Sequence, residues 1–213
     1  AIVISNELLN FIWDIQPMSD RFMSITLGYC IPVSFISTYI PTAMAERDKK
    51  DKAYEELSEE QNRLQKKGPA YTGGDFNARI TNELDNDGLH IIGQHTFDNK
   101  HEETTLDNSM ISNRDQLINH CVKNQLQITN TFYEKSEEKL CTYKGVKNRQ
   151  QIERENNQYI SEHKVDRYNY YDTKDYWLTQ NRWKKTVCNC ESDMKANVNS
   201  DHYPLVYRHY DQT

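Results

Sequence analysis

The sequence of 213 residues has no uninterrupted apolar run that approaches the roughly 18 residues needed to cross a bilayer. Its mean hydropathy is only -0.94, so we expect no transmembrane helix and no membrane partner. Positive charge is not in excess either, because 26 Lys and Arg stand against 32 Asp and Glu and give a net charge of -6. This balance excludes a protein that holds nucleic acid by bulk charge alone. Any phosphate-binding site must be locally basic or assisted by a metal.

Cysteines are few and show no pairing pattern. The five thiols are odd in number and scattered, which is typical of free cysteines in a reducing compartment rather than of a disulfide framework. Cys188 and Cys190 have no second Cys or His pair nearby, so we interpret them as alternating strand positions rather than as a metal site. The sequence has neither a basic leader segment nor a targeting run of Lys and Arg. We therefore expect an intracellular protein.

Bulky side chains are numerous enough to form a core. Hydrophobic residues make up 36% of the sequence, which contains 14 Tyr, 6 Phe and 3 Trp. A chain of this length buries enough of them to fold without a second domain. The sequence has no internal repeat, and we predict a single domain over residues 1–213.

Short apolar and β-branched runs bounded by turn residues predict the strands. The first of them, Ala1–Ile4, has no preceding turn or cap and resembles an interior strand whose partners lie upstream. The further predicted strands are Phe22–Leu27, Val33–Ile40, Ala70–Asp75, Leu126–Phe132, Leu140–Tyr143, Tyr176–Thr179, Thr186–Cys190 and Pro204–Tyr210.

Two segments have the spacing of amphipathic helices. The first helix lies within Met44–Lys67 and ends before Gly68-Pro69, and a capping box at Ser112–Asp115 predicts the start of the second. Residues 81–108 and 145–173 are polar and predict long loops. Strands and helices that alternate in this way indicate an α/β fold.

The segment Gly73-Gly74-Asp75-Phe76-Asn77 is the most informative for function. Asp75 and Asn77 are two residues apart, and an extended backbone would point both side chains to one side. A carboxylate that accepts a proton or binds a hard metal would then share a cleft with an amide that donates hydrogen bonds. The alternative, favoured by the tripeptide alone, is an Asp-x-Asn turn that caps its own backbone.

Further candidates lie at the ends of other predicted strands. Asp201 and His202 precede the last apolar strand, where such a pair suits metal and phosphate chemistry, although it is more often a solvated turn. Asp175 enters an aromatic strand, where it either orients an imidazole or forms an ion pair with Lys174. Tyr39 ends a strand and either offers its hydroxyl to a phosphate or is a core aromatic residue.

Four of these segments, taken in order, resemble the motifs of the endonuclease/exonuclease/phosphatase superfamily, whose members share the DNase I-like fold. They are Tyr39-Ile40-Pro41, Gly74-Asp75-Phe76-Asn77-Ala78, Asp175-Tyr176 and Ser200-Asp201-His202. With Asn130-Thr131-Phe132 and Asn181-Arg182-Trp183-Lys184 between them, the set is most similar to the apurinic-type endonuclease domain of non-LTR retrotransposon proteins. The resemblance covers nearly the whole chain.

The resemblance implies an α/β fold of the DNase I-like four-layer type, two packed mixed β-sheets flanked by helices, incomplete at the N-terminus. It also implies a divalent-metal-dependent phosphodiesterase that hydrolyses DNA with Mg2+ or Mn2+. The partners would be DNA and a reverse transcriptase domain in the parent polyprotein. A protein that acts on genomic DNA would be located in the nucleus.

The resemblance also assigns roles to individual residues. Asp75 would position or deprotonate the attacking water, and Asn77 would hydrogen-bond the phosphate or that water. His202, oriented by Asp175, would stabilise the charge that builds on the phosphorus, and Asp201 would contribute to the metal site. The phosphate contacts would be Tyr39 at the scissile group and, as a local basic patch, Arg182, Lys184 and Lys185.

The sequence departs from this family in three ways. Members place an Asn on their first strand and a metal-binding Glu on the next, and the sequence has neither upstream of Ala1–Ile4. Glu7 is no substitute, because Asn6–Leu9 is typical of a helix start. Lys174 stands where members usually have an apolar residue.

The alternative to an endonuclease is therefore a catalytically inactive fragment or remnant that binds nucleic acid or a protein. A phosphoinositide, sphingolipid or poly(A) substrate is a third interpretation.

Overall fold

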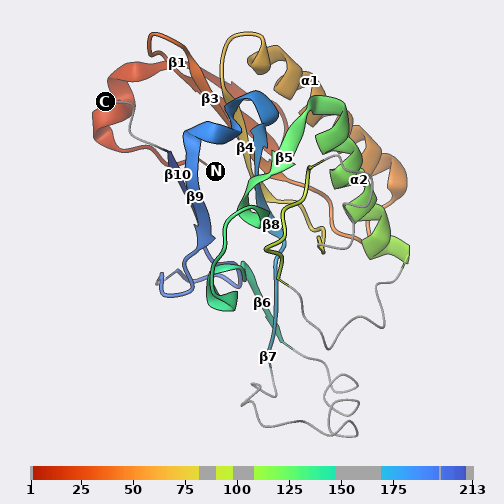
Figure 1. The fold of residues 1–213 in the computed structure, drawn as a ribbon. Coiled ribbons are helices and arrows are strands. Elements are labelled where there is room, and N and C mark those ends of the chain that lie inside the picture. Colours follow the sequence, from red (N-terminus) through yellow and green to blue (C-terminus); the bar gives the residue numbers. More distant parts are fainter. Residues whose placement is uncertain (1, 82–89, 98–107, 147–168, 197, 210–213) are drawn as a thin grey trace, which may run out of the picture.

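The computed structural model describes residues 2–81, 90–97, 108–146, 169–196 and 198–209 (Figure 1). Its elements alternate between strands and helices along the chain, as the sequence predicts. Among the described residues, none of the helices is long and apolar enough to cross a membrane.

A mixed sheet of six strands in the order β1-β2-β3-β4-β8-β5 forms the centre of the molecule. Only β3 and β4 run parallel, and every other neighbouring pair in this sheet is antiparallel. The parallel pair needs a long crossover, which the first α-helix provides. The strands are β1 (Ile12–Pro17), β2 (Phe22–Leu27), β3 (Val33–Tyr39), β4 (Ala70–Asp75), β5 (Leu126–Ile128) and β8 (Asp175–Gln180).

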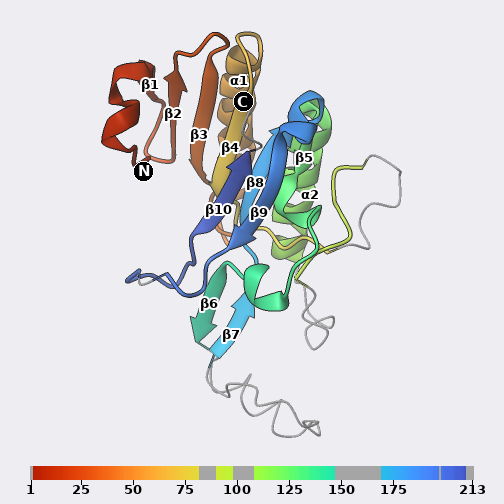
Figure 2. The same ribbon diagram turned by 60° about the vertical axis from the view of Figure 1, so that its left-hand side comes forward.

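Two helices, α1 (Arg47–Gln65) and α2 (Asn108–Asn124), cover one face of this sheet (Figure 2). Their apolar side chains pack against those of the strands and form the core. Fully buried members include Leu57 of α1, Leu117 of α2 and Leu178 of β8. Each such buried side chain contributes about 1.5–3 kcal/mol to the stability of the fold, which exceeds what the polar outer faces of the helices contribute.

The hairpin of β9 (Val187–Ser192) and β10 (Leu205–His209) lies on the opposite face, in front of the sheet in Figure 2. Tyr207 of β10 stacks on Trp177 of β8, with the ring centroids 4.6 Å apart, and approaches Tyr71 of β4 at 5.4 Å. Aromatic rings therefore join the hairpin to the sheet. A second pair of strands, β6 (Tyr143–Val146) and β7 (Asn169–Asp172), projects from the end of the molecule (Figure 1).

Several expected elements differ at the N-terminal side. Residues 2–5 form no strand, so the strand predicted at Ala1–Ile4 is wrong, and Val3 is 94% exposed with no sheet beside it. A 3-10 helix, η1 (Asn6–Phe11), follows, in agreement with the helix start expected at Asn6–Leu9. The edge strand β1 was not predicted, because apolar and polar residues do not alternate regularly in its sequence. In the structure its Trp13 and Ile15 are exposed.

The second half of the chain also differs from expectation in places. The helix α2 begins at Asn108, so the capping box predicted at Ser112–Asp115 is wrong. The strand expected over Leu126–Phe132 ends at Ile128 and continues as the 3-10 helix η3 (Thr129–Thr131). Strands β6 and β7 occupy the two ends of the loop predicted at 145–173, while 147–168 lies outside the described residues, as do 82–89 and 98–107 of the loop predicted at 81–108.

Candidate active site

The ends of three adjacent strands bring the predicted site residues to one edge of the sheet. Tyr39 ends β3 and pairs with Asp75 at the end of β4, and Asp75 in turn pairs with Asp175 at the start of β8. Residues paired across strands project to the same face of a sheet. The register therefore places two carboxylates, which are 100 residues apart in sequence, side by side at the mouth of the sheet.

The glycines before Asp75 allow this close approach of the strands. Gly74 has a φ of 148°, and a Cβ atom at this position would lie 2.0 Å from the carbonyl oxygen of Thr38. A Cβ at Gly73 would lie 2.2 Å from the ring of Trp177. Only glycine meets both requirements without moving β3 or β8 away.

Asn77 orients Asp75 through a tight turn. Its backbone N–H donates to Asp75 Oδ1 at 2.8 Å, and its side-chain Nδ2 donates to Asp75 Oδ2 at 3.2 Å and to the carbonyl of Ile40 at 2.9 Å. Its φ of 47° is left-handed, which Asn tolerates better than most residues. The turn is held in turn by Asn113 of α2, whose amide donates to the Asn77 carbonyl at 2.9 Å.

His202 completes the cluster from the loop before β10. Its Nδ1 lies 2.8 Å from Asp175 Oδ2, and its Nε2 faces Asp75 Oδ2 at 3.9 Å. The side chains of Asp75, Asp175 and His202 are 13%, 16% and 28% exposed, so the cluster is recessed but open to a substrate. Since a carboxylate only accepts hydrogen bonds, Nδ1 carries a proton and donates a hydrogen bond to Asp175.

Thr142 fixes the loop that carries His202 to the start of β8. Its Oγ1 accepts the backbone N–H groups of Lys174 and Asp175 at 3.0 Å each, and its carbonyl accepts the N–H of Tyr203 at 2.8 Å. Thr142 is fully buried. Thr142 lies in no predicted site motif, and Asn113 was predicted only as part of a capping box, because each acts on a residue more than 30 positions away.

The environment shifts the pKa of two members of the cluster. Burial, together with the neighbouring charge of Asp175, raises the pKa of Asp75 to about 6 against the opposing effect of the Asn77 hydrogen bond. The hydrogen bond to Asp175 raises the pKa of His202 above its ordinary value of 6.5, against a smaller effect of burial. A base that titrates near neutrality beside a protonated imidazole is the pairing that acid–base chemistry requires.

The remaining predicted residues lie around this cluster or apart from it. Tyr39 is 46% exposed, with the guanidinium of Arg21 5.4 Å from its ring centroid. Asp201 is exposed and adjoins His202, and its carbonyl accepts the N–H of Lys144 at 2.8 Å. The predicted basic patch lies in η5 (Asn181–Thr186), at the other end of β8 and about 17 Å along the strand from Asp175. The structure does not bring Arg182, Lys184 and Lys185 to the cluster.

The cluster does not form a closed metal site. Among the described residues, no group of three or more His, Cys, Asp and Glu side chains is arranged to hold a metal ion. Asp201 is a hard oxygen donor of the kind that Mg2+ prefers, but Asp175 is engaged by His202 and Asp75 by Asn77. These donors by themselves do not fit a complete magnesium site.

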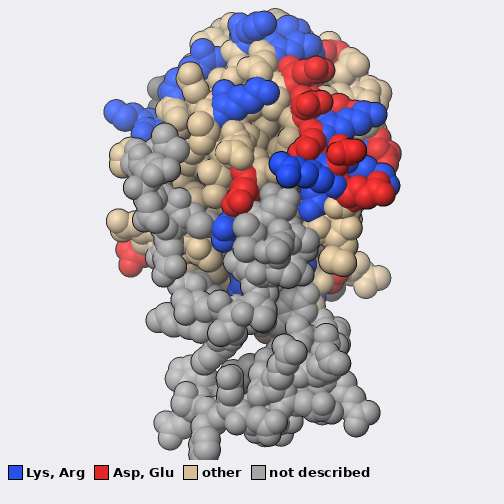
Figure 3. Space-filling model, turned by 90° about the vertical axis from the view of Figure 1, so that its right-hand side faces the viewer, with Lys and Arg blue, Asp and Glu red and all other residues tan. Residues whose placement is uncertain are grey.

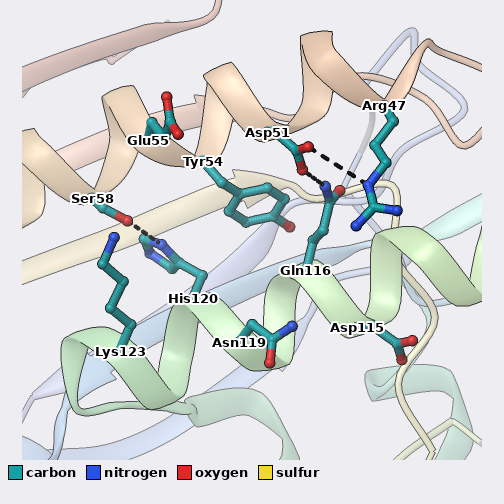
Figure 4. A pocket seen from close by; sticks show the side chains of 10 residues that line it. All are labelled: Arg47, Asp51, Tyr54, Glu55, Ser58, Asp115, Gln116, Asn119, His120 and Lys123. Atoms are coloured by element: carbon teal, nitrogen blue, oxygen red, sulfur yellow. Dashed lines mark hydrogen bonds and ion pairs between the residues drawn. The ribbon is translucent and has the colours of Figure 1, made fainter.

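A hollow lies between α1 and α2, on the helical face of the sheet. The helical face carries Lys and Arg mixed with Asp and Glu (Figure 3), and the hollow in it has a volume of about 610 Å³ (Figure 4). Beneath it, Ser58 Oγ and His120 Nδ1 lie 3.0 Å apart, and Asn124 Nδ2 donates to Ser58 Oγ at 3.2 Å. This buried polar network joins the two helices, so we interpret it as structural.

No protein-family model matches the chain. Craniofacial development protein 2 of Bos taurus is 24% identical over 208 residues, which are 97% of this chain and 29% of that protein. The endonuclease domain of TRAS1, a telomere-specific non-LTR retrotransposon, has a TM-score of 0.53 and 12% identity, over 91% of this chain and 65% of that one. An AP endonuclease from Archaeoglobus fulgidus has a TM-score of 0.55 and 15% identity, over 93% and 71%.

The 3' phosphatase NExo from Neisseria, solved with a product DNA hairpin, gives a TM-score of 0.54 at 12% identity, over 89% of this chain and 65% of that one. These likenesses confirm the predicted DNase I-like α/β fold. The chain spans less than a third of the length of this curated relative and about two thirds of the TRAS1 endonuclease domain and of NExo.

Proposed function

We propose, from the DNase I-like fold and the cluster at its sheet edge, that this chain hydrolyses phosphodiester bonds of DNA. The observation that supports this most directly is the placement of His202 within hydrogen-bonding distance of Asp175 and within ion-pairing distance of Asp75. Hydrolysis of a phosphodiester needs a base to take a proton from water and a cation to offset the charge on the phosphorus. The cluster holds one group of each kind.

Asp75 is the proposed base. Its carboxylate lies at the sheet edge with a pKa raised to about 6 by burial, so it is mostly ionised at neutral pH and still basic enough to accept a proton. Asn77 holds both carboxylate oxygens in place, and its amide hydrogens are directed at Asp75 and Ile40. We therefore propose that Asn77 acts first by orienting Asp75.

His202 is the proposed electrophilic group. Asp175 fixes the imidazole through Nδ1, which leaves Nε2–H of the protonated ring directed toward the space beside Asp75. A phosphate placed there would receive a charge-assisted hydrogen bond from Nε2. Asp175 acts as a positioning residue, because it holds the ring and favours its charged form.

A divalent cation, Mg2+ or Mn2+, is proposed as the cofactor. When bound, it would offset negative charge on the phosphate. Asp201 would hold it, with water and the substrate supplying further oxygen ligands. Because the described donors do not complete a site, we expect weak binding of the metal to the free chain.

We further propose that the chain is the endonuclease part of a retroelement-type protein, with a reverse transcriptase domain in the same polyprotein and a nuclear location. The likeness to the TRAS1 endonuclease domain supports this context. Tyr39 is proposed to contact the scissile phosphate. Arg182, Lys184 and Lys185 are proposed to contact phosphates further along a bound duplex.

The test is nicking of supercoiled plasmid by the purified chain in Mg2+ and in EDTA. We expect nicking in Mg2+ only, and Asp201→Ala should abolish it while shifting the thermal unfolding midpoint little, because Asp201 is exposed. The matched control is Glu59→Ala, which removes an exposed carboxylate from α1 on the far side of the molecule. Nicking that survives Asp201→Ala would refute the assignment of Asp201.

The absence of a three-ligand metal group among the described residues favours a second candidate function. In that case the chain binds nucleic acid or a protein without cleaving it. A folded chain that binds duplex DNA and leaves supercoiled plasmid intact in Mg2+ and in Mn2+ would support this second function over the first.

A further inference from the structure

Lys174 lies at the candidate active site, next to Asp175 and before the start of β8. Its Nζ is 3.5 Å from the centroid of the Tyr143 ring, a close cation–π contact. Its backbone is fixed on both sides, because its N–H donates to Thr142 Oγ1 at 3.0 Å and its carbonyl accepts the N–H of Phe76 at 2.9 Å. The side chain is half-buried, so the ammonium group has a preferred position but is not enclosed.

Tyr143 connects this ammonium group to His202. The two rings meet edge to face with their centroids 4.9 Å apart, and the backbones of the two residues form an antiparallel bridge. Lys174, Tyr143 and His202 therefore form a row along one side of the cluster. The charge of Lys174 also reaches Asp75, whose pKa it lowers against the effect of burial.

Two other basic side chains are placed differently. Arg21 stacks over Tyr39 on the β2–β3 side, and Lys184 lies at the far end of β8. Lys174 is joined through one aromatic ring to the imidazole of the cluster. A substrate phosphate that reaches His202 Nε2 would thus lie beside a second, fixed positive charge.

We propose that Lys174 binds a non-bridging oxygen of the nucleic-acid phosphate that occupies the cluster. The inference rests on the proposed function, because it names the group that holds the substrate of the same site. The stack on Tyr143 restricts the flexible lysine stem, so less conformational entropy is lost when the ammonium binds phosphate. Because the net charge is -6, a chain without a bound metal needs a local cation of this kind to bind an anionic backbone.

The experiment measures binding of the full chain to a short DNA duplex in EDTA, where no metal-dependent cleavage occurs, over a range of salt concentrations. We expect Lys174→Met to weaken binding at low salt about five- to tenfold and to reduce the magnitude of the log–log salt slope by about 0.9, the value for one lost phosphate contact. Lys174→Arg keeps the charge and should retain the slope. Lys52→Met, which removes a lysine whose side chain is 77% exposed on α1, is the matched control.

Each outcome decides the inference. If Lys174→Met weakens binding without changing the salt slope, or changes the slope no more than Lys52→Met does, Lys174 only supports Tyr143 and the inference is wrong while the proposed function stands. If the wild-type chain neither binds duplex nor nicks plasmid, the proposed function fails and the inference fails with it. Thermal unfolding of each variant checks that the loss of the Tyr143 contact leaves the chain folded.

Discussion

At the residue scale, the ionised carboxylate of Asp75 should destabilise the fold above about pH 6, where it is available as a base. Its pKa is raised from 3.8 to about 6, so its stabilising contribution is fully present below pH 3.8 and is lost as the pH rises through 6. We expect Asp75→Asn to be more stable than the wild type at pH 8 by about 1–3 kcal/mol, and no more stable at pH 4. Urea unfolding at the two pH values measures this difference.

The control for this prediction is Asp115→Asn, in which the side chain is 55% exposed on α2. Its effect at either pH should stay within about 0.5 kcal/mol. A wild-type chain that is more stable than Asp75→Asn at pH 8 would mean that the carboxylate is stabilised by its neighbours, and that Asp75 is not poised as a base.

The sequence identified the two residues of this turn for a reason that the structure changes. The two-residue spacing predicted side chains on one side of an extended strand, but the strand ends at Asp75 and Asn77 has a φ of 47°. The bond from the Asn77 N–H to Asp75 Oδ1 is the self-capping turn that was the alternative interpretation. The turn and the candidate site are thus the same structure, which local spacing alone does not show.

At the element scale, the packing of α1 on α2 should make the protein sensitive to acid through His120. Burial lowers the pKa of this imidazole from 6.5 to about 3. Because the pKa is lowered on folding, the stability tied to the neutral ring is fully present above pH 6.5 and is lost as the pH falls toward 3. We expect the free energy of unfolding to fall by roughly 1 kcal/mol per pH unit over this interval.

His120→Gln removes the titrating group and serves as the test. The variant should be less stable than the wild type at pH 7.5, because Ser58 and Asn124 lose the acceptor Nδ1, but its stability should depend less on pH between 6.5 and 4. Chemical unfolding of both proteins at several pH values measures the two slopes. Equal slopes would contradict this prediction, because they would show that the pKa of His120 is the same in the folded and the unfolded protein.

The elements best predicted from the sequence are those whose periodicity reports burial. Helix α1 buries Tyr54, Leu57 and Leu64, the apolar positions whose helical spacing predicted it, and β2 has the bounds that its apolar run predicted. The predicted start of α2 was wrong because Asn113, part of the predicted capping box, does not cap the helix. Its side-chain amide donates to the carbonyls of Pro41 and Asn77 instead. A long-range hydrogen bond of this kind competes with a local cap and leaves no periodic signal.

At the scale of the whole molecule, the site depends on two layers that meet through few contacts. Asp75 and Asp175 belong to the central sheet, while His202 belongs to the loop that leads into β10 on the other face. The order of the motifs along the sequence predicted that these residues converge. It did not show which contacts hold the hairpin against the sheet, because aromatic side chains at strand positions pack equally well in many registers.

Tyr207 is the contact that should hold the two layers together. Its ring stacks on Trp177 at 4.6 Å and packs against Tyr71 at 5.4 Å, so Tyr207→Ala should cost about 3–5 kcal/mol in the free energy of unfolding. Tyr207→Phe keeps the stacked ring and should cost much less. Urea unfolding measures the stability of each variant, with Arg208→Ala, an exposed neighbour on the same strand that pairs with Glu191 at 3.6 Å, as the control.

The same substitution should also affect catalysis, because the hairpin positions His202. If the layers are coupled as the structure indicates, Tyr207→Ala lowers the rate of plasmid nicking at a temperature where the variant is still folded, and Arg208→Ala does not. A Tyr207→Ala variant that is destabilised but nicks at the wild-type rate would show that the bonds of Thr142 and Asp175 hold His202 in place without the hairpin. The position of the imidazole would then depend on the sheet edge alone.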